Sequence, residues 1–240
     1  MIIDVDFDFS TDARGGDPDS TSPTLRRYHR LLWNKMLPIG RIFALCDDVS
    51  GAYLYHSSDC GEFYLGSDAI THSYKNQRRK QWLIRQIPQE SEELFHAGLT
   101  IGAYILFPNR RIDGKPTINQ ERGVNNLIDD RFDLTLECIR RFYSGIESPL
   151  YETLQRYASF FDLFQDFDGY VRFFLLDDLV DGNGSVRFYL PFDGFATPPI
   201  FRDTTDYLEY KHRVLKFIRS RNRRIADYSQ SMNTLSESCT

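Results

Sequence analysis

Apolar residues recur every three or four positions in the segment 128–143. The residues of this stripe are Ile128, Phe132, Leu136, Ile139 and Tyr143. A repeat of this length is typical of a helix that buries one face and exposes the other. The pattern therefore predicts an amphipathic helix over residues 128–143 that packs through this stripe onto the protein core.

Two further helices are indicated by their starts. Ser22 followed by Pro23 has the order of an N-cap and a first helical residue, and Leu25, Tyr28 and Leu32 would then face inward. Near the other end of the sequence, Asp203 or Thr204 can cap a long helix that reaches about residue 227. The predicted inward side of this helix consists of Tyr207, Tyr210, Val214, Phe217 and Ile218.

Strand-like runs are shorter and come mostly before the helices. Alternation of acidic and apolar residues predicts a half-buried strand over residues 4–9. Three runs separated by turn residues predict an antiparallel meander, and they cover residues 42–45, 52–56 and 62–65. Further strands are expected over residues 103–107 and 185–190. Shorter helices are expected over residues 74–85, 90–97, 149–164 and, on length, 169–180.

Strands that come first and helices that come later favour an α+β fold, with an antiparallel sheet and several packed helices. We expect a single α+β domain over residues 1–228 and a flexible C-terminal tail over residues 229–240, because the last residues are polar. A chain of 240 residues with 41% hydrophobic side chains can build one substantial core.

Charge and cysteine content limit the classes of function. A net charge of −5 argues against a nucleic-acid coat over the whole surface. The four cysteines form no Cys-x-x-Cys pair and have no histidine at metal-ligand spacing, so no metal site is predicted, and Cys138 is expected to be a reduced core thiol. The acidic start lacks the pattern of a signal peptide, and no apolar run is long enough to cross a membrane. We therefore expect a cytoplasmic protein with no membrane contact.

The densest group of polar side chains lies just before and at the start of the predicted 128–143 helix. We predict ligand-binding roles for Asn119, Gln120, Arg122, Asn125 and Arg131. The two arginines would hold an anionic group at a helix start, and the amides would select the ligand by hydrogen bonds. Asp130 is the candidate catalytic residue, as a general base or, if a cation takes part, as its ligand. The alternative is that an asparagine only caps the helix and the aspartates complement its dipole.

The last predicted helix carries a second signal. Cations fall on the side opposite its apolar residues, and the nucleic-acid candidates among them are Arg213, Lys216, Arg219 and Arg223. A basic stripe of this kind fits the phosphates of a nucleic acid. It could equally face water or pair with the carboxylates of this acidic chain.

Several stretches resemble a bacterial protein family that is classed only as a domain of unknown function. They are SPTLRRYHRLLWNKMLPIG (22–40), GEFYLGSDAI (61–70), RFDLTLECIRRFYSGIESPL (131–150), VRFYLPFDGF (186–195) and KFIRSRNRRI (216–225). The resemblance covers nearly the whole chain and implies a single-domain bacterial protein. It implies no catalytic residues, because no activity is established for that family.

Two hypotheses for the function follow. The first is a cytoplasmic protein that binds or acts on a nucleotide-like or other anionic ligand, in a pocket between the 117–133 loop, the first helix and the 191–199 loop. The second is a non-catalytic interaction protein that docks a nucleic acid or a protein through its basic C-terminal helix. The sequence contains no phosphate-binding loop, dinucleotide fingerprint or recognisable catalytic triad. It therefore leaves the cofactor unknown and does not decide whether the protein is an enzyme.

Overall fold

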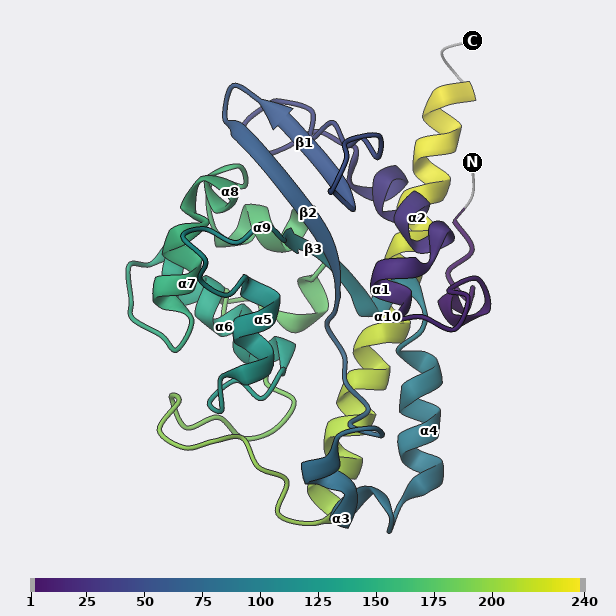
Figure 1. Cartoon of the computed structure of the whole chain (residues 1–240), viewed down its shortest axis with the longest axis vertical. Coiled ribbons are helices and arrows are strands. Elements are labelled where there is room, and N and C mark those ends of the chain that lie inside the picture. Colours follow the sequence, from purple (N-terminus) through teal and green to yellow (C-terminus); the bar gives the residue numbers. More distant parts are fainter. Residues whose placement is uncertain (1–2, 238–240) are drawn as a thin grey trace.

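The computed structural model describes residues 3–237, with side chains through residue 232, and Figure 1 shows its arrangement. The strands are β1 (Leu54–Ser58), β2 (Gly61–Ala69) and β3 (Tyr104–Pro108). The helices are α1 (Pro18–Thr21), α2 (Pro23–Trp33), α3 (Gln81–Ile84), α4 (Pro88–Ala97), α5 (Ile118–Val124), α6 (Phe132–Tyr143), α7 (Tyr151–Arg156), α8 (Ala158–Asp162), α9 (Phe167–Phe173) and α10 (Thr204–Glu237). Short 3₁₀ helices are η1 (Phe9–Thr11), η2 (Arg78–Lys80), η3 (Ile101–Ala103) and η4 (Asp177–Leu179). The predicted α+β class is confirmed.

The sheet is antiparallel and has the order β1-β2-β3. β1 pairs with the first half of β2, from Ser58↔Gly61 to Leu54↔Leu65, and β3 pairs with the second half. Every residue of β3 is buried, because helices cover it. In Figure 1, α5 to α9 lie on one side of β2, whereas α2 and the long helix α10 lie on the other.

The three helices expected from clear patterns are present. Ser22 Oγ accepts a hydrogen bond from the Leu25 N–H at 3.1 Å, which is the predicted N-cap of α2. Asp203 Oδ1 accepts from two N–H groups at the start of α10. All predicted inward residues of α10 are buried, and so are Ile128, Phe132, Leu136 and Ile139 of the α6 stripe. Ile128 precedes the helix, however, because α6 begins only at Phe132.

The predicted strand over residues 4–9 is wrong. Asp4 Oδ1 accepts from the Asp6 N–H at 3.0 Å, and Asp8 Oδ1 accepts from the Ser10 N–H at 2.8 Å. Such local bonds fold the backbone into turns and compete with strand pairing. Phe9, at the end of this segment, is nevertheless fully buried.

Two other predicted strands reduce to single bridges. Residues 42–45 pair back onto the segment that follows α2 through Met36↔Ile42, and residues 185–190 pair only through Val180↔Val186. The third strand of the meander is therefore β3, which comes from a distant part of the sequence. The expected helix over 149–164 is divided into α7 and α8, and that over 169–180 into α9 and η4.

α10 continues to Glu237, about ten residues beyond its predicted end. Ser229, in the predicted tail, is buried, and its Oγ accepts from the Ile3 N–H at 3.2 Å. The boundary at residue 228 and the flexible tail stay predictions, and residues 238–240 of that tail lie outside the described residues. Cys239 lies there too, whereas Cys138 is a buried free thiol as predicted.

Candidate functional site

Two of the predicted ligand-binding residues hold the ends of helix α5. Gln120 forms a capping box with Thr117 at its start, and the Gln120 Oε1 also accepts from Arg111 Nε at 3.0 Å. Asn125 ends the helix; its Oδ1 accepts from the Leu127 N–H at 3.0 Å and its Nδ2 donates to the Pro149 carbonyl. The amides of Gln120 and Asn125 therefore serve the local backbone, and their ligand-binding roles stay predictions.

Arg122 is fully buried between the sheet and α6. Its Nε donates to Thr135 Oγ1 at 2.9 Å, its Nη1 forms an ion pair with Asp68, and its Nη2 lies 3.4 Å from Asp130 Oδ1. Arg122 thus takes part in buried ion pairs with two aspartates, and its predicted role as an anion holder stays a prediction. A long side chain on the inner face of α5 reaches carboxylates that the sequence separates from it by up to 54 positions.

Two of this arginine's partners, Asp68 and Asp130, line a hollow beside the predicted loop. We call it the acidic cavity; it has a volume of about 580 Å³. Its polar lining includes four aspartates and one histidine, namely Asp17, Asp19, Asp68, Asp130 and His72. Of the predicted residues, Asn119 and Asp130 line this cavity, whereas Arg131 does not.

The carboxyl groups of the cavity differ in proton affinity. Burial raises the pKa of Asp68 to about 6, although the Arg122 charge acts to lower it. Burial acts in the same way on Asp130, but Arg122 and a hydrogen bond from His72 outweigh it and lower the pKa of Asp130 to about 2. Burial and the nearby charge of Asp68 raise the pKa of Asp19 to about 7. Neighbouring carboxyl groups thus hold their protons very differently near neutral pH.

His72 completes this group. Its Nε2 lies 2.8 Å from Asp130 Oδ2. Burial acts to lower the pKa of His72, but the hydrogen bond and charge of Asp130 raise it overall. The imidazole and the carboxylate therefore form a coupled pair at the cavity wall, with Arg122 behind the carboxylate.

Two further observations mark this cavity. Thr71 lines it and is buried, yet its Oγ1 has no hydrogen-bond partner within the described part of the chain. Tyr74 and Asp130, also in the wall, have φ angles of 56° and 61°. Left-handed backbone at residues other than glycine is strained and is enriched at functional sites. A buried hydroxyl without a partner is what a bound ligand would satisfy.

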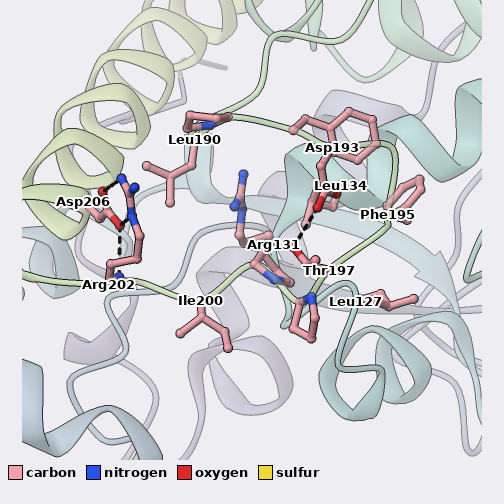
Figure 2. A pocket seen from close by; sticks show the side chains of 14 residues that line it. Leu127, Arg131, Leu134, Leu190, Asp193, Phe195, Thr197, Ile200, Arg202 and Asp206 are labelled. Carbon is pink, nitrogen blue, oxygen red and sulfur yellow. Dashed lines mark hydrogen bonds and ion pairs between the residues drawn. The ribbon is translucent and has the colours of Figure 1, made fainter.

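The second hollow lies beneath the 191–199 loop, and we call it the aromatic-loop pocket. Figure 2 shows Arg131 near its centre and the Arg202–Asp206 pair at one end. Its volume is about 250 Å³. This pocket does lie between the 117–133 and 191–199 segments, but the expectation that the first helix also lines it is wrong, since no residue of α2 does. That it binds a ligand stays a prediction.

Both arginines of the aromatic-loop pocket are already matched by carboxylates. Arg131 donates to Asp133 through Nε and Nη2, and Arg202 donates to Asp206 through the same two atoms. Asp193 adds a negative charge to the same wall. The pocket therefore has no excess of positive charge, and the role of Arg131 as an anion holder stays a prediction.

The basic face of α10, defined as Arg213, Lys216, Arg219 and Arg223, is exposed as predicted. Arg213 forms an ion pair with Glu209, and Arg219 lies 3.8 Å from Glu93. Arg213 and Lys216 also line a hollow of about 260 Å³ beside Phe217. Part of this positive charge is thus offset by carboxylates of the same chain.

Asp19, Asp68 and His72 were not predicted as site residues. The sequence separates Asp19 from Asp130 by more than a hundred positions, and only the fold brings both to one cavity. Ser67 and His29 are also in contact, at 2.9 Å, but they do not form a nucleophile and its base. Trp33 Nε1 donates to His29 Nδ1, so His29 Nε2 must carry a proton and donate to Ser67.

Among the described residues, no group of three or more histidine, cysteine or carboxylate side chains has the geometry of a metal site. Within the same part of the chain, no helix combines the length and apolarity needed to span a bilayer.

Comparison with known proteins gives a family but no activity. No curated protein and no solved structure matches the chain. A family model does match, over residues 3–225, so the similarity covers nearly the whole sequence. The bacterial origin expected from the resemblance stays a prediction. The matched range contains the acidic cavity and α10 through Ile225: the chain belongs to the family of unknown function DUF6994.

Proposed function

We propose that the acidic cavity binds a small polar ligand that donates hydrogen bonds, and that its carboxyl groups perform acid–base chemistry on that ligand. The observation that carries the proposal is the convergence of Asp19, Asp68 and Asp130 with His72 on one cavity. A cavity of this volume, with a few polar groups that converge on it, is the usual form of a small-molecule site.

The negative charge of the acidic cavity determines which class of ligand it can bind. The carboxylates of the wall accept hydrogen bonds, which suits hydroxyl or ammonium groups. The cations near them are already engaged, because Arg122 pairs with two aspartates and Lys75 pairs with Glu92. A bare phosphate would therefore meet net negative charge. This narrows the expectation of a nucleotide-like or anionic ligand to molecules whose uncharged or cationic part enters the cavity.

The roles of the residues follow from their proton affinities. Asp130, whose pKa is about 2, is ionised throughout the neutral range and can accept a proton or hold a donor. Asp19, whose pKa is about 7, carries a proton in a large fraction of molecules and can donate it. Two carboxyl groups with well-separated pKa values are the pattern of an acid and a base in one site.

The test is a thermal-shift screen with paired compounds. Adenosine, glucose and putrescine represent uncharged and cationic ligands, and AMP and glucose 6-phosphate are the phosphorylated counterparts. A ligand of the cavity should raise the melting temperature of the native chain, because it binds only the folded state. The rise should be lost in Asp130→Asn and kept in Asp227→Asn, an exposed control. Stabilisation by the phosphorylated members alone, or a full shift in Asp130→Asn, would contradict the proposal.

A second candidate function is docking of a nucleic acid on the basic face. All four cations are exposed, and two of them border a hollow beside an aromatic ring. Cations next to ring faces suit a phosphate backbone and its bases. Against it stand the ion pairs to Glu209 and Glu93. The cytoplasmic location that both candidates share is also part of this proposal.

A further inference from the structure

Within the part of the chain that the structure describes, one edge of β2 has no strand beside it over residues 66–69. β1 stops at the pair Leu54↔Leu65, whereas β3 continues along the other edge as far as Ala69↔Tyr104. Helix α1 occupies the open edge, and Figure 1 shows it next to this end of β2. There Asp19 Oδ2 accepts from the Ala69 N–H at 3.3 Å. The Asp19 carboxylate thus accepts a hydrogen bond that the backbone of a neighbouring strand would otherwise accept.

Two hollows border this edge of β2. Successive strand residues point to opposite faces, and the contacts agree: Asp68 reaches Arg122 of α5, whereas Ser67 contacts His29 of α2. Asp68 lines the acidic cavity. Ser67 lines a second hollow of about 460 Å³, which we call the edge hollow. Asp19 lines both, so its side chain lies between the two hollows.

The edge hollow has a different chemistry from the acidic cavity. Apart from Asp19 its polar lining consists of hydroxyls, one amide and one guanidinium, from Ser20, Thr21, Ser22, Tyr53, Ser67, Asn109 and Arg26. Two of its buried polar atoms, Tyr53 Oη and Arg26 Nε, make no hydrogen bond within the described residues. Because His29 Nε2 donates to Ser67 Oγ, the Ser67 hydroxyl keeps its own proton for another acceptor.

We propose that the two hollows together bind an elongated, uncharged polyhydroxylated ligand, a short oligosaccharide, with one unit in the acidic cavity, the next in the edge hollow and their linkage beside Asp19. The inference rests on the proposed function of the acidic cavity and adds to it a substrate class and a second subsite.

The lining favours this class over others. Carboxylate and amide oxygens accept from hydroxyls, and the Ser67 hydroxyl and Arg26 can donate to ring and hydroxyl oxygens. Aromatic residues are present in both parts: Tyr74, Phe95 and Tyr104 line the acidic cavity, and Tyr53 lines the edge hollow. Each hollow alone has the volume of a small-molecule site, so the pair has room for more than one unit.

The experiment measures dissociation constants by calorimetry on the full chain for glucose, N-acetylglucosamine and the β-linked disaccharides and trisaccharides of each. Joining two subsites should tighten binding of a disaccharide over its monosaccharide on the order of tenfold or more. Ser20→Trp places a bulky group in the edge hollow from an exposed position on α1. It should remove the advantage of length and leave monosaccharide binding unchanged. Ser231→Trp, on the exposed side of α10, is the matched control.

Amide shifts by NMR provide a second measurement that needs no variant. A disaccharide should shift the amide signals of Tyr53 and Asn109 together with those of the acidic cavity, whereas a monosaccharide should shift only the latter. Equal affinity for both lengths, an unchanged preference in Ser20→Trp, or the absence of any saccharide binding would each overturn the inference. Binding of a monosaccharide, adenosine or putrescine in the acidic cavity would still support the proposed function, so the two can fail separately.

Discussion

At the scale of single residues, the burial of Arg122 and Arg131 changes how these two arginines are interpreted. The polar segment that contains Arg122 and Arg131 suggests a ligand-facing loop, yet Arg122 lies in α5, both side chains are almost completely buried and each is paired with an aspartate. The sequence could not show this, because Asp68 comes from a distant strand. Asp133 is only two positions from Arg131, but whether a neighbouring carboxylate turns toward an arginine depends on the packing around both.

Arg122→Lys tests whether the buried ion pairs and hydrogen bonds of this residue stabilise the fold. Lysine keeps the charge but cannot reach Thr135, Asp68 and Asp130 together, so buried acceptors would lose their donors. We expect the free energy of unfolding to fall by about 2–4 kcal/mol in urea titrations. Arg213→Lys, in an exposed pair, should change it by less than about 0.5 kcal/mol. Equal stability of Arg122→Lys and the native chain would show that the fork of hydrogen bonds contributes nothing to folding.

Asp19 should make stability depend on pH in a defined direction. Its pKa of about 7 in the folded protein lies above the ordinary value of 3.8, so the folded state holds the proton more tightly than the unfolded chain. The stabilisation from this proton is complete below pH 4 and is lost as the pH rises to 7. Asp19→Asn should therefore raise the unfolding free energy by about 2–4 kcal/mol at pH 8.

The same variant should have little effect at pH 4, where the native carboxyl group is protonated. Chemical denaturation at both pH values, with Asp227→Asn as an exposed control, measures the difference. A gain of equal size at pH 4 and pH 8 would mean that the ionisation of Asp19 is not its cause. A gain in unfolding free energy at pH 8 would also fit the view that Asp19 is kept for function at a cost in stability.

At the scale of elements, the sequence was most informative where one face of a helix is continuous. α2, α6 and the first part of α10 followed from capping residues and apolar stripes, because those signals are local. The strands were less predictable. Residues 4–9 alternate like a strand, but Asp4 and Asp8 bond to their own backbone instead. β3 joins β2 from far along the chain, and no local pattern can indicate such a partner.

The candidate site was predictable to the extent that it is local. Asn119 and Asp130 were found because they lie in one dense polar stretch. Asp19 and Asp68 each occur in short acidic or strand-like segments that look ordinary. Only the fold brings both to one cavity, at the open edge of β2. His72 gave no signal beyond its residue type, since its partner Asp130 is 58 positions away in the sequence.

Leu136→Ala tests the packing of α6. Leu136 is fully buried in the core, so its truncation removes apolar contacts and leaves a cavity. We expect a loss of about 2–5 kcal/mol in unfolding free energy, seen as a lower urea midpoint with an unchanged slope. Leu208→Ala, on the exposed side of α10, should stay within about 0.5 kcal/mol. A small loss at Leu136 would place the α6 stripe outside the core.

At the scale of the whole molecule, charge is unevenly distributed. A chain with a net charge of −5 gathers aspartates at the acidic cavity and exposed cations on one side of α10. The family match covers both regions and assigns no role to either. Whether either region binds a partner can therefore be decided only by binding measurements.

The basic face gives a quantitative prediction. If it binds a nucleic acid, the logarithm of the association constant should fall by about 0.9 per tenfold rise in salt for each phosphate neutralised. Replacing Arg213, Lys216, Arg219 and Arg223 by glutamine should flatten this slope in fluorescence-anisotropy titrations with duplex and single-stranded oligonucleotides. The control is Lys115→Gln, which removes one exposed positive charge outside the basic face and leaves Arg26, Arg27 and Arg30 unchanged. Undetectable binding of any oligonucleotide by the native chain at low salt would eliminate this candidate.

The contact between Ile3 and Ser229 has a consequence for the connectivity of the fold. The two residues are 226 positions apart in the sequence, yet the N–H of one donates to the hydroxyl of the other. In Figure 1 the first described residues lie beside the upper turns of α10. A peptide linker that joins α10 to the segment beginning at Ile3, together with a new opening at the exposed turn around Gly182, would give a circular permutant with the same neighbours in space. In such a permutant the segments that form the core would still meet, although they would follow one another in a different order along the chain.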